Sequence, residues 1–567
     1  MSSRRTPKTG YKSQRGSLVR KATDSMLEAE ESENLRKYRE LKPTYAGKQL
    51  GNDEFGDSTV SLASSGTSTP DMSANTTGSS FTTVSDLSTN KEVITQVTTT
   101  TKTESKTYER KSRRPRYKDV KFQPHTTIFE AEASRSSVFT GFYTLFWLGT
   151  FVLFVKTVSE NYKRTGYILD THVLHTLFRD LYKIAFTDLA LFLSTFMNVF
   201  LQKAVAARQV SWPKFAWLVQ SFYELFFIIF AIWFPIHLDY PWIGRVFLCL
   251  HSLVLLMKQH SYSFFCGYMS VVRNDLAMFE SALAGLKNEE GPKTPSVSQR
   301  DQEDKLQQEI AICKTELSSA LPGSNIMYPQ NVTLFNFFDY MMLPTLVYEV
   351  EYPRTKSIRW SYVFEKLVAI FGVFFLMIII AEQYFYPVVM LAVSLRSLNF
   401  YDKVLEYPFL LLQLLFPFML MYLLTWYIIW DAILNEIAEL TRFADRYFYG
   451  AWWNSVQWDQ FARDWNVPVH QFLLRHVYHS SISAFRVSKG AATVITFLLS
   501  SIVHELVMFV IFKKLRGYLL VLQMLQLPLV QLSKTSFFKH RRVFGNIVFW
   551  LGIYTGPSMM CVLYLTF

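Results

Sequence analysis

One histidine lies inside a strongly apolar stretch of this chain. Residues 490–512 read GAATVITFLLSSIVHELVMFVIF, with His504 and Glu505 in the C-terminal half. About 20 apolar residues are enough to cross a bilayer as a helix. An acid or base near the centre of such a helix costs on the order of 2.5–3.5 kcal/mol, and such groups usually face a cavity and carry function. His504 is therefore a candidate catalytic group; the alternative is a core histidine bonded to a neighbouring helix.

The imidazole of His504 suits general base catalysis. It titrates near neutrality, so it can accept the proton of an alcohol that attacks an acyl group. Burial lowers the pKa of a histidine, which would keep the ring neutral and able to accept. Ser500 lies four residues earlier on the same helix face, so its hydroxyl could bond the imidazole or the acyl donor, or bond back to its own helix. Glu505 lies about 100° round the helix and is expected to be a structural partner on another face.

A second segment, residues 431–489, is too polar to cross lipid but dense in Trp, Phe and Tyr. Such a composition favours a re-entrant or interfacial segment. Four of its aromatic residues could form an amphipathic wall at the membrane surface, or simply anchor an aromatic belt: Phe448, Tyr449, Trp452 and Trp453. Asn454 follows them directly, and a buried amide must find partners. We therefore treat Asn454 as a second candidate site residue.

Four short blocks are similar to motifs of one enzyme family. FYGAWWN, residues 448–454, resembles the signature FYxDWWN, and SSIVHE, residues 500–505, resembles an active-site histidine segment. PTLVYEVEYPR, residues 344–354, and KQHSYSF, residues 258–264, resemble two further blocks. Together they resemble the membrane-bound O-acyltransferase (MBOAT) family over roughly residues 135–567. The resemblance is closest to the fungal sterol O-acyltransferases.

One position departs from the signature. The family's usual acid is Ala451 here. Alanine can neither accept a side-chain hydrogen bond nor balance a cation, so the role of that carboxylate in relatives is in question. Asn454 and His504 are unaffected, and we still expect activity.

The resemblance implies an enzyme that transfers a long-chain fatty acyl group from acyl-coenzyme A to the 3β-hydroxyl of a sterol. The products are a steryl ester for lipid storage and free coenzyme A. His504 is the expected general base, and Asn454 is expected to orient the thioester or stabilise the developing oxyanion. His470 lies in a WNxxVH-like block and is either structural or part of the coenzyme path. The expected acyl-CoA and substrate contacts are Phe448, Tyr449, Trp452, Trp453, His470 and Ser500.

Acyl-CoA is expected as a co-substrate, with no cofactor and no metal, because no cluster has metal-ligand spacing. Direct attack in a ternary complex is preferred to an acyl-enzyme, since no cysteine adjoins His504. A diacylglycerol acyltransferase shares the FYxDWWN-like block and is the closest alternative. A transporter or a non-catalytic sterol-binding protein are the others, although the duplicated halves of many transporters are missing here.

The composition predicts an all-α polytopic membrane protein. Of the 567 residues, 50% are hydrophobic and 16% aromatic, although the first quarter is polar. Residues 1–125 form a Ser/Thr-rich region expected to be disordered, and residues 126–567 form the membrane domain. The formal net charge of +12 accompanies no nucleic-acid motif. Nine helices are expected to enclose a catalytic chamber, near residues 138–156, 184–202, 214–235, 242–257, 362–382, 408–430, 490–512, 516–532 and 543–565.

The basic cluster at residues 109–118 favours a cytosolic N-terminus. Nine crossings then place the loops 258–361 and 431–489 in the cytosol and the C-terminus in the lumen. Within the first loop, residues 299–321 predict a helix with a packing face. The expected address is the endoplasmic reticulum membrane, and relatives suggest a homodimer or homotetramer.

Overall fold

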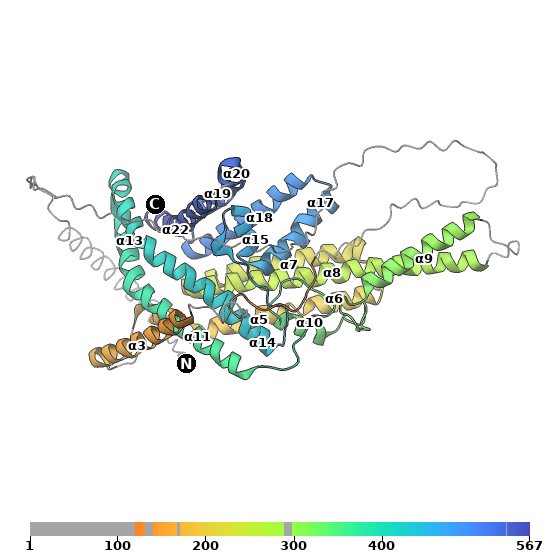
Figure 1. The fold of residues 1–567 in the computed structure, drawn as a ribbon, viewed down its shortest axis with the longest axis horizontal. Coiled ribbons are helices and arrows are strands. Elements are labelled where there is room, and N and C mark those ends of the chain that lie inside the picture. The colour runs from red at the N-terminus through yellow and green to blue at the C-terminus, as the bar shows by residue number, and fades with distance from the viewer. Residues whose placement is uncertain (1–119, 131–139, 167–170, 289–296, 540) are drawn as a thin grey trace, which may run out of the picture. The chain divides into compact units, whose positions relative to one another are not determined.

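Helices are the main regular structure of the described chain. The computed structural model describes residues 120–130, 140–166, 171–288, 297–539 and 541–567. Within these ranges the backbone forms helices and loops with three isolated β-bridges and no strand, which confirms the all-α prediction (Figure 1). Residues 1–119, most of the expected disordered region, lie outside the described residues.

Eight helical segments of the described chain are long and apolar enough to cross a membrane. The first four are α3 (Thr140–Thr165), α5 with α6 (Leu181–Ser194, Met197–Ala206), η1 with α7 (Trp212–Ala216, Trp217–His237) and α8 (Trp242–Asn288). The next two contain α11, η2, α12 and η3 (Trp360–Ile380, Ala381–Phe385, Tyr386–Ser394, Leu395–Ser397), then α13, η4 and α14 (Phe400–Trp426, Tyr427–Ile433, Leu434–Leu440). The last two are α18 (Lys489–Phe512) and α22 (Arg542–Thr566).

The ninth predicted span, 516–532, is not one helix of spanning length. It consists of two short helices, α19 (Tyr518–Met524) and α20 (Gln526–Ser533). The apolar stretch Tyr518–Ser533 covers about 24 Å at 1.5 Å per residue, less than the roughly 30 Å of the hydrocarbon core. Eight crossings would return the C-terminus to the side of the N-terminus, so a lumenal C-terminus requires this stretch to cross as well.

The polar stretch after residue 257 is not a loop. Helix α8 continues through it to Asn288, and α9 (Val297–Leu317) packs back along α8 (Figure 1). Lys258 at the start of this stretch is buried, because its ammonium donates to the carbonyls of Tyr340, Met341 and Leu343, although the sequence around it looks solvated.

The predicted helix at 299–321 is confirmed with its packing face, because Ile310, Cys313 and Leu317 of α9 are buried. Helix α10 (Leu334–Met342) follows, and the chain then runs without regular structure to α11.

The segment expected to carry the site begins as helix and then becomes irregular. Helix α13 continues through η4 and α14 to Leu440, after which the chain forms η5 (Trp452–Asn454), α15 (Trp458–Asp464) and α16 (Val467–Phe472). It leads through η6 (Leu473–Tyr478) and α17 (His479–Phe485) into α18. Helix α18 packs against α8, η6, α17 and α19.

Candidate active site

The signature loop, residues 448–454, is held on both sides by backbone contacts. The amide of Gly450 donates to the carbonyl of Asp464, and the amide of Val467 donates to the carbonyl of Phe448, at 2.8 and 3.0 Å. On the other side, the side chains of Asn546 and Trp550 in α22 both donate to the carbonyl of Trp453, at 3.1 Å. The loop is thus fixed between α15, α16 and α22.

Three of the four signature aromatics lie in the core. Phe448 and Tyr449 are 2% exposed and Trp452 is 1% exposed, whereas Trp453 is half-buried. The expected wall at the membrane surface is therefore wrong for these three side chains. They pack edge-on with other rings instead, such as Trp452 against Trp465 at 4.9 Å and 82°, because aromatic pairs favour such geometry.

Two indole N–H groups in this aromatic cluster have no acceptor among the described contacts. They belong to Trp452 and to Trp426 of α13, whose rings meet at 5.3 Å. Buried polar groups are normally paired, and an unpaired one costs roughly 1–3 kcal/mol. The cluster therefore contains two buried donors without an acceptor in the described structure.

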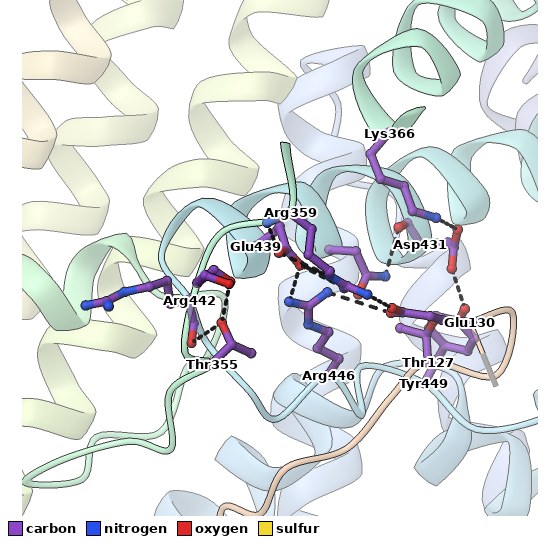
Figure 2. A network of polar contacts seen from close by, with 12 residues as sticks. Thr127, Glu130, Thr355, Arg359, Lys366, Asp431, Glu439, Arg442, Arg446 and Tyr449 are labelled. Atoms are coloured by element: carbon purple, nitrogen blue, oxygen red, sulfur yellow. Dashed lines mark hydrogen bonds and ion pairs between the residues drawn. The ribbon is translucent and has the colours of Figure 1, made fainter. Parts of the chain in front are cut away.

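A buried ion pair holds the side chain of Tyr449. Its hydroxyl donates to one carboxylate oxygen of Asp431 at 2.6 Å, and the ammonium of Lys366 donates to the other at 2.6 Å (Figure 2). Burial raises the pKa of Tyr449, so the phenol remains a proton donor. The three groups connect α11, η4 and the signature loop.

Two arginines and two glutamates form a second part of the same network. The guanidinium groups of Arg359 and Arg446 converge on Glu439 of α14, and both also contact Glu130 (Figure 2). Glu439 is completely buried and Arg446 is 3% exposed. Positive and negative charges balance, as burial of ions requires. The network fixes the backbone that leads into the signature loop.

The chain before α3 contributes to this support. His125 forms a backbone bridge with Asp445 and an Nδ1 contact with its carboxylate at 3.0 Å. The ring of Phe129 stacks on Trp453 with 6.0 Å between centroids. Residues 120–125 are expected from the sequence to be disordered, but they pack along residues 443–446, just before the signature loop.

His504 is on an exposed face of α18. Its Nδ1 lies 2.7 Å from the carbonyl oxygen of Ser500. A carbonyl can only accept, so Nδ1 carries the proton of the neutral ring and Nε2 has a free lone pair. The expected burial of this side chain is therefore wrong for the single chain. The hydrogen bond within its own helix fixes the tautomer in which Nε2 can accept a proton.

Glu505 has the structural role expected of it. Its carboxylate is 3% exposed and accepts from the backbone amides of Arg516, Gly517, Leu519 and Leu520, and from the hydroxyl of Tyr564. A carboxylate at a helix N-terminus stabilises it. Glu505 thus holds the start of α19 and points away from the ring of His504.

The other predicted residues are placed as follows. Asn454 is exposed at the end of η5, and its amide side chain has no hydrogen bond among the described contacts, so it is not the buried amide expected. Ser500 contacts the imidazole through its carbonyl and not its hydroxyl. His470 is half-buried in α16; burial lowers its pKa, and the charge of Arg463 adds to that effect. No hydrogen bond joins Asn454 to His504 in the described structure, where both are surface groups.

Sequence reasoning missed a buried serine–histidine pair. The hydroxyl of Ser261 in α8 lies 2.8 Å from Nε2 of His476 in η6, and it also accepts from the amide of Tyr348 at 2.8 Å. Beside it, His260 contacts Glu224 at 2.9 Å. The HSY of the KQHSYSF block marked half of this pair, but nothing local marks His476. Among the described residues, no group of three His, Cys, Asp or Glu side chains could hold a metal.

Comparisons with known proteins agree with this architecture. "Sterol O-acyltransferase 2" of Candida albicans is 44% identical over 482 residues, which cover 80% of this chain and 79% of that protein. "Sterol O-acyltransferase 2" of Saccharomyces cerevisiae is 46% identical over 439 residues, or 76% and 67% of the two chains. "Diacylglycerol O-acyltransferase 1" of Dictyostelium discoideum is 34% identical, but over only 43% of this chain and 38% of that protein.

The model of the membrane-bound O-acyltransferase family matches residues 138–566. The match includes both the signature loop and α18, whose residues carried the resemblance. With its helical membrane architecture, this chain belongs to the membrane-bound O-acyltransferase family.

Proposed function

We propose that this protein is a sterol O-acyltransferase, which transfers a long-chain fatty acyl group from acyl-CoA to the 3β-hydroxyl of a membrane sterol. The sterol enzymes match most of this chain at 44–46% identity, whereas the diacylglycerol enzyme matches less than half of it. The observation that carries the chemistry is the free Nε2 of His504 in a helix that can cross the membrane.

In the proposed reaction, Nε2 of His504 accepts the proton of the sterol hydroxyl as its oxygen attacks the thioester carbonyl. A C–O bond forms, the C–S bond breaks, and the thiolate of coenzyme A takes the proton back from the imidazolium. No acyl-enzyme forms and no cofactor takes part. The enzyme regains its neutral ring after each turnover.

The thioester oxygen gains negative charge during the attack and needs donors. Asn454 has an amide without a partner, and the indole N–H of Trp452 is buried without an acceptor. We assign Asn454 to the thioester and Trp452 to the acyl-CoA chain. Phe448, Tyr449 and Trp453 shape the same loop, while His470 lines the approach of the coenzyme.

The test is esterification by membranes from cells that lack their own steryl ester synthesis. With labelled oleoyl-CoA, we expect label in steryl ester when ergosterol or cholesterol is the acceptor, and His504→Gln should abolish it. His237→Gln is the matched control, since His237 is also an exposed histidine in an apolar helix. Near-normal activity of His504→Gln would refute the assignment, and label in triacylglycerol instead of steryl ester would favour the diacylglycerol reaction.

For Asn454→Ala we expect a loss of about 10²-fold, by analogy with removal of one oxyanion donor. A loss smaller than about twofold would leave Asn454 without a part in the oxyanion site.

We further infer a homodimer or homotetramer in the endoplasmic reticulum membrane, with a cytosolic N-terminus. The basic cluster at 109–118 supports that orientation. The C-terminus is lumenal only if Tyr518–Ser533 completes a crossing. Protease protection of tags at the two ends decides the topology, and crosslinking in microsomes decides the oligomeric state.

A further inference from the structure

A polar cavity lies away from the signature loop and α18. It has a volume of about 150 Å³ and is bounded by the end of α6, the turn into η1, the middle of α8 and the loop after α9. Six of its lining residues matter here: Arg208, Ser211, Trp212, Arg273, Asn274 and Tyr328. Nothing in the proposed reaction uses this cavity.

Two guanidinium groups line the cavity, and neither has a carboxylate partner among the described contacts. Arg273 is anchored by one bond, from Nη1 to the carbonyl of Ala206 at 2.9 Å. Its remaining N–H donors are available, because a guanidinium has five. Arg208 sits just after α6 in the left-handed region at φ 61°, which is uncommon for a residue other than glycine. The cavity thus presents two positive charges.

A buried hydroxyl supplies an independent sign of a missing ligand. Tyr328 is 2% exposed and lines the cavity, yet its hydroxyl has no partner among the described contacts. Burial raises the pKa of Tyr328, so the hydroxyl keeps its proton and donates. A buried donor without an acceptor is costly. Two guanidinium groups line the space, and the unpaired hydroxyl belongs to a residue of its wall. This combination matches an anion with several oxygen atoms.

Helix length places the cavity outside the hydrocarbon core, at or just beyond the depth of the lipid headgroups. Arg273 is 31 residues beyond Trp242, the first residue of α8, which is about 46 Å along a helix at 1.5 Å per residue. A bilayer measures roughly 40–45 Å with its headgroups and roughly 30 Å without them. Trp212 begins the neighbouring span close by, because its ring packs on Gly267 of α8, about 9 Å before Arg273 along the helix.

We propose that this cavity binds the phosphate group of an anionic phosphate ester at the membrane surface. Arg208 and Arg273 neutralise the phosphate, which Arg recognises well through paired N–H bonds, and Tyr328 donates to a third oxygen. The volume is below the roughly 300–1,000 Å³ of pockets for whole drug-sized ligands, so the site holds a headgroup phosphate and leaves the rest of the molecule outside. Phosphatidic acid in the bilayer and the phosphates of acyl-CoA share this chemistry.

The experiment uses the purified full-length protein in a neutral detergent. Fluorescent phosphatidic acid is titrated directly, and unlabelled phosphatidic acid, coenzyme A and inorganic phosphate compete with it. The variants are Arg273→Gln, Arg208→Gln and Tyr328→Phe, with Lys214→Gln as the matched control. Lys214 is an exposed cation of η1 in the same turn that does not line the cavity. Thermal unfolding of each variant establishes that it is folded.

We expect each arginine variant to weaken binding about tenfold, which corresponds to about 1.4 kcal/mol, while Lys214→Gln leaves it unchanged. Weaker binding of phosphatidic acid alone by the arginine variants identifies a lipid headgroup as the ligand. Weaker competition by coenzyme A, together with a raised KM for oleoyl-CoA, identifies acyl-CoA as the ligand. Both outcomes support a phosphate site.

Equal binding by the wild type, both arginine variants and Tyr328→Phe would overturn the proposal. Tyr328→Phe keeps the ring in place, so it still reports on the site if an arginine variant fails to fold. Lipid binding needs no turnover, so its failure is separate from a failure of the proposed acyl transfer.

Discussion

Replacement of Asp431 by asparagine should loosen the signature loop by leaving a buried charge without its partner. Asp431 is 1% exposed and accepts from Lys366 and from Tyr449, each at 2.6 Å. The amide of Asp431→Asn can still accept from Tyr449, but it no longer balances the ammonium of Lys366. Since the side chain of Lys366 is only 7% exposed, water cannot replace the lost carboxylate.

The expected loss of stability in Asp431→Asn follows from the burial of this ion pair. Removal of one partner of a buried ion pair costs about 3–5 kcal/mol, whereas replacement of both partners by neutral groups is often close to neutral. The double variant Lys366→Met with Asp431→Asn should therefore be more stable than Asp431→Asn alone. With an unfolding entropy of ~2.1 cal/mol/K per residue, 1 kcal/mol corresponds to on the order of 1 °C in a chain of this size. The single variant should melt roughly 3–5 °C lower.

The assay is thermal unfolding in detergent, with steryl ester synthesis measured on the same preparations. The single variant should lose activity together with stability, because Tyr449 and the signature loop depend on this carboxylate. The double variant should recover most of both. If Asp431→Asn melts like the wild type, or if adding Lys366→Met gives no recovery, the ion pair does not hold the loop.

Three further predictions concern the loop and its histidines. Gly450→Ala should destabilise the protein by about 1–3 kcal/mol, since its Cβ would lie 2.8 Å from Cγ of Asp464; a higher or unchanged melting temperature would contradict this. Burial lowers the pKa of His470 in the folded state, so protonation of this ring favours unfolding. The stability from the neutral ring is complete above about pH 6.5, the pKa of the unfolded state, and is lost as the pH falls through the lower pKa of the folded state. Melting curves at several pH values should show a smaller loss in His470→Gln. Ser500→Ala should keep at least about half of the wild-type activity, because the carbonyl of Ser500, not its hydroxyl, fixes the tautomer of His504; a loss near that of His504→Gln would assign a role to the hydroxyl.

The apolar helices could be predicted closely from the sequence. Residues 490–512 were expected to cross, and α18 is Lys489–Phe512. Helix α8 could not be predicted beyond its apolar half, because Lys258 and its polar neighbours look solvated along the chain. Only the folded chain supplies the carbonyls of α10 and Leu343 that satisfy that ammonium.

The contacts that support the signature loop could not be predicted from the sequence either. His125 meets Asp445 across 320 residues, and Glu130 meets Arg359 across 229. Sequence periodicity describes only neighbours along one helix or strand. It therefore identified the loop but not the segment that packs along it, and it left the second half of the Ser261–His476 pair unrecognised.

Structural groups and candidate catalytic groups in this protein differ in whether their hydrogen bonds are made within the chain. The carboxylates of Asp431, Glu439 and Glu505 are buried, and each accepts hydrogen bonds from at least two groups of the protein, so they belong to the framework. Among the described contacts, Nε2 of His504 and the indole N–H of Trp452 have no partner at all. Nε2 of His504 can accept a proton, and the indole N–H of Trp452 can donate a hydrogen bond. An acyl transfer to an alcohol requires a base for the hydroxyl and a donor for the thioester carbonyl. His504 can supply the base, and the amide of Asn454 is the unpaired donor that we assign to the thioester.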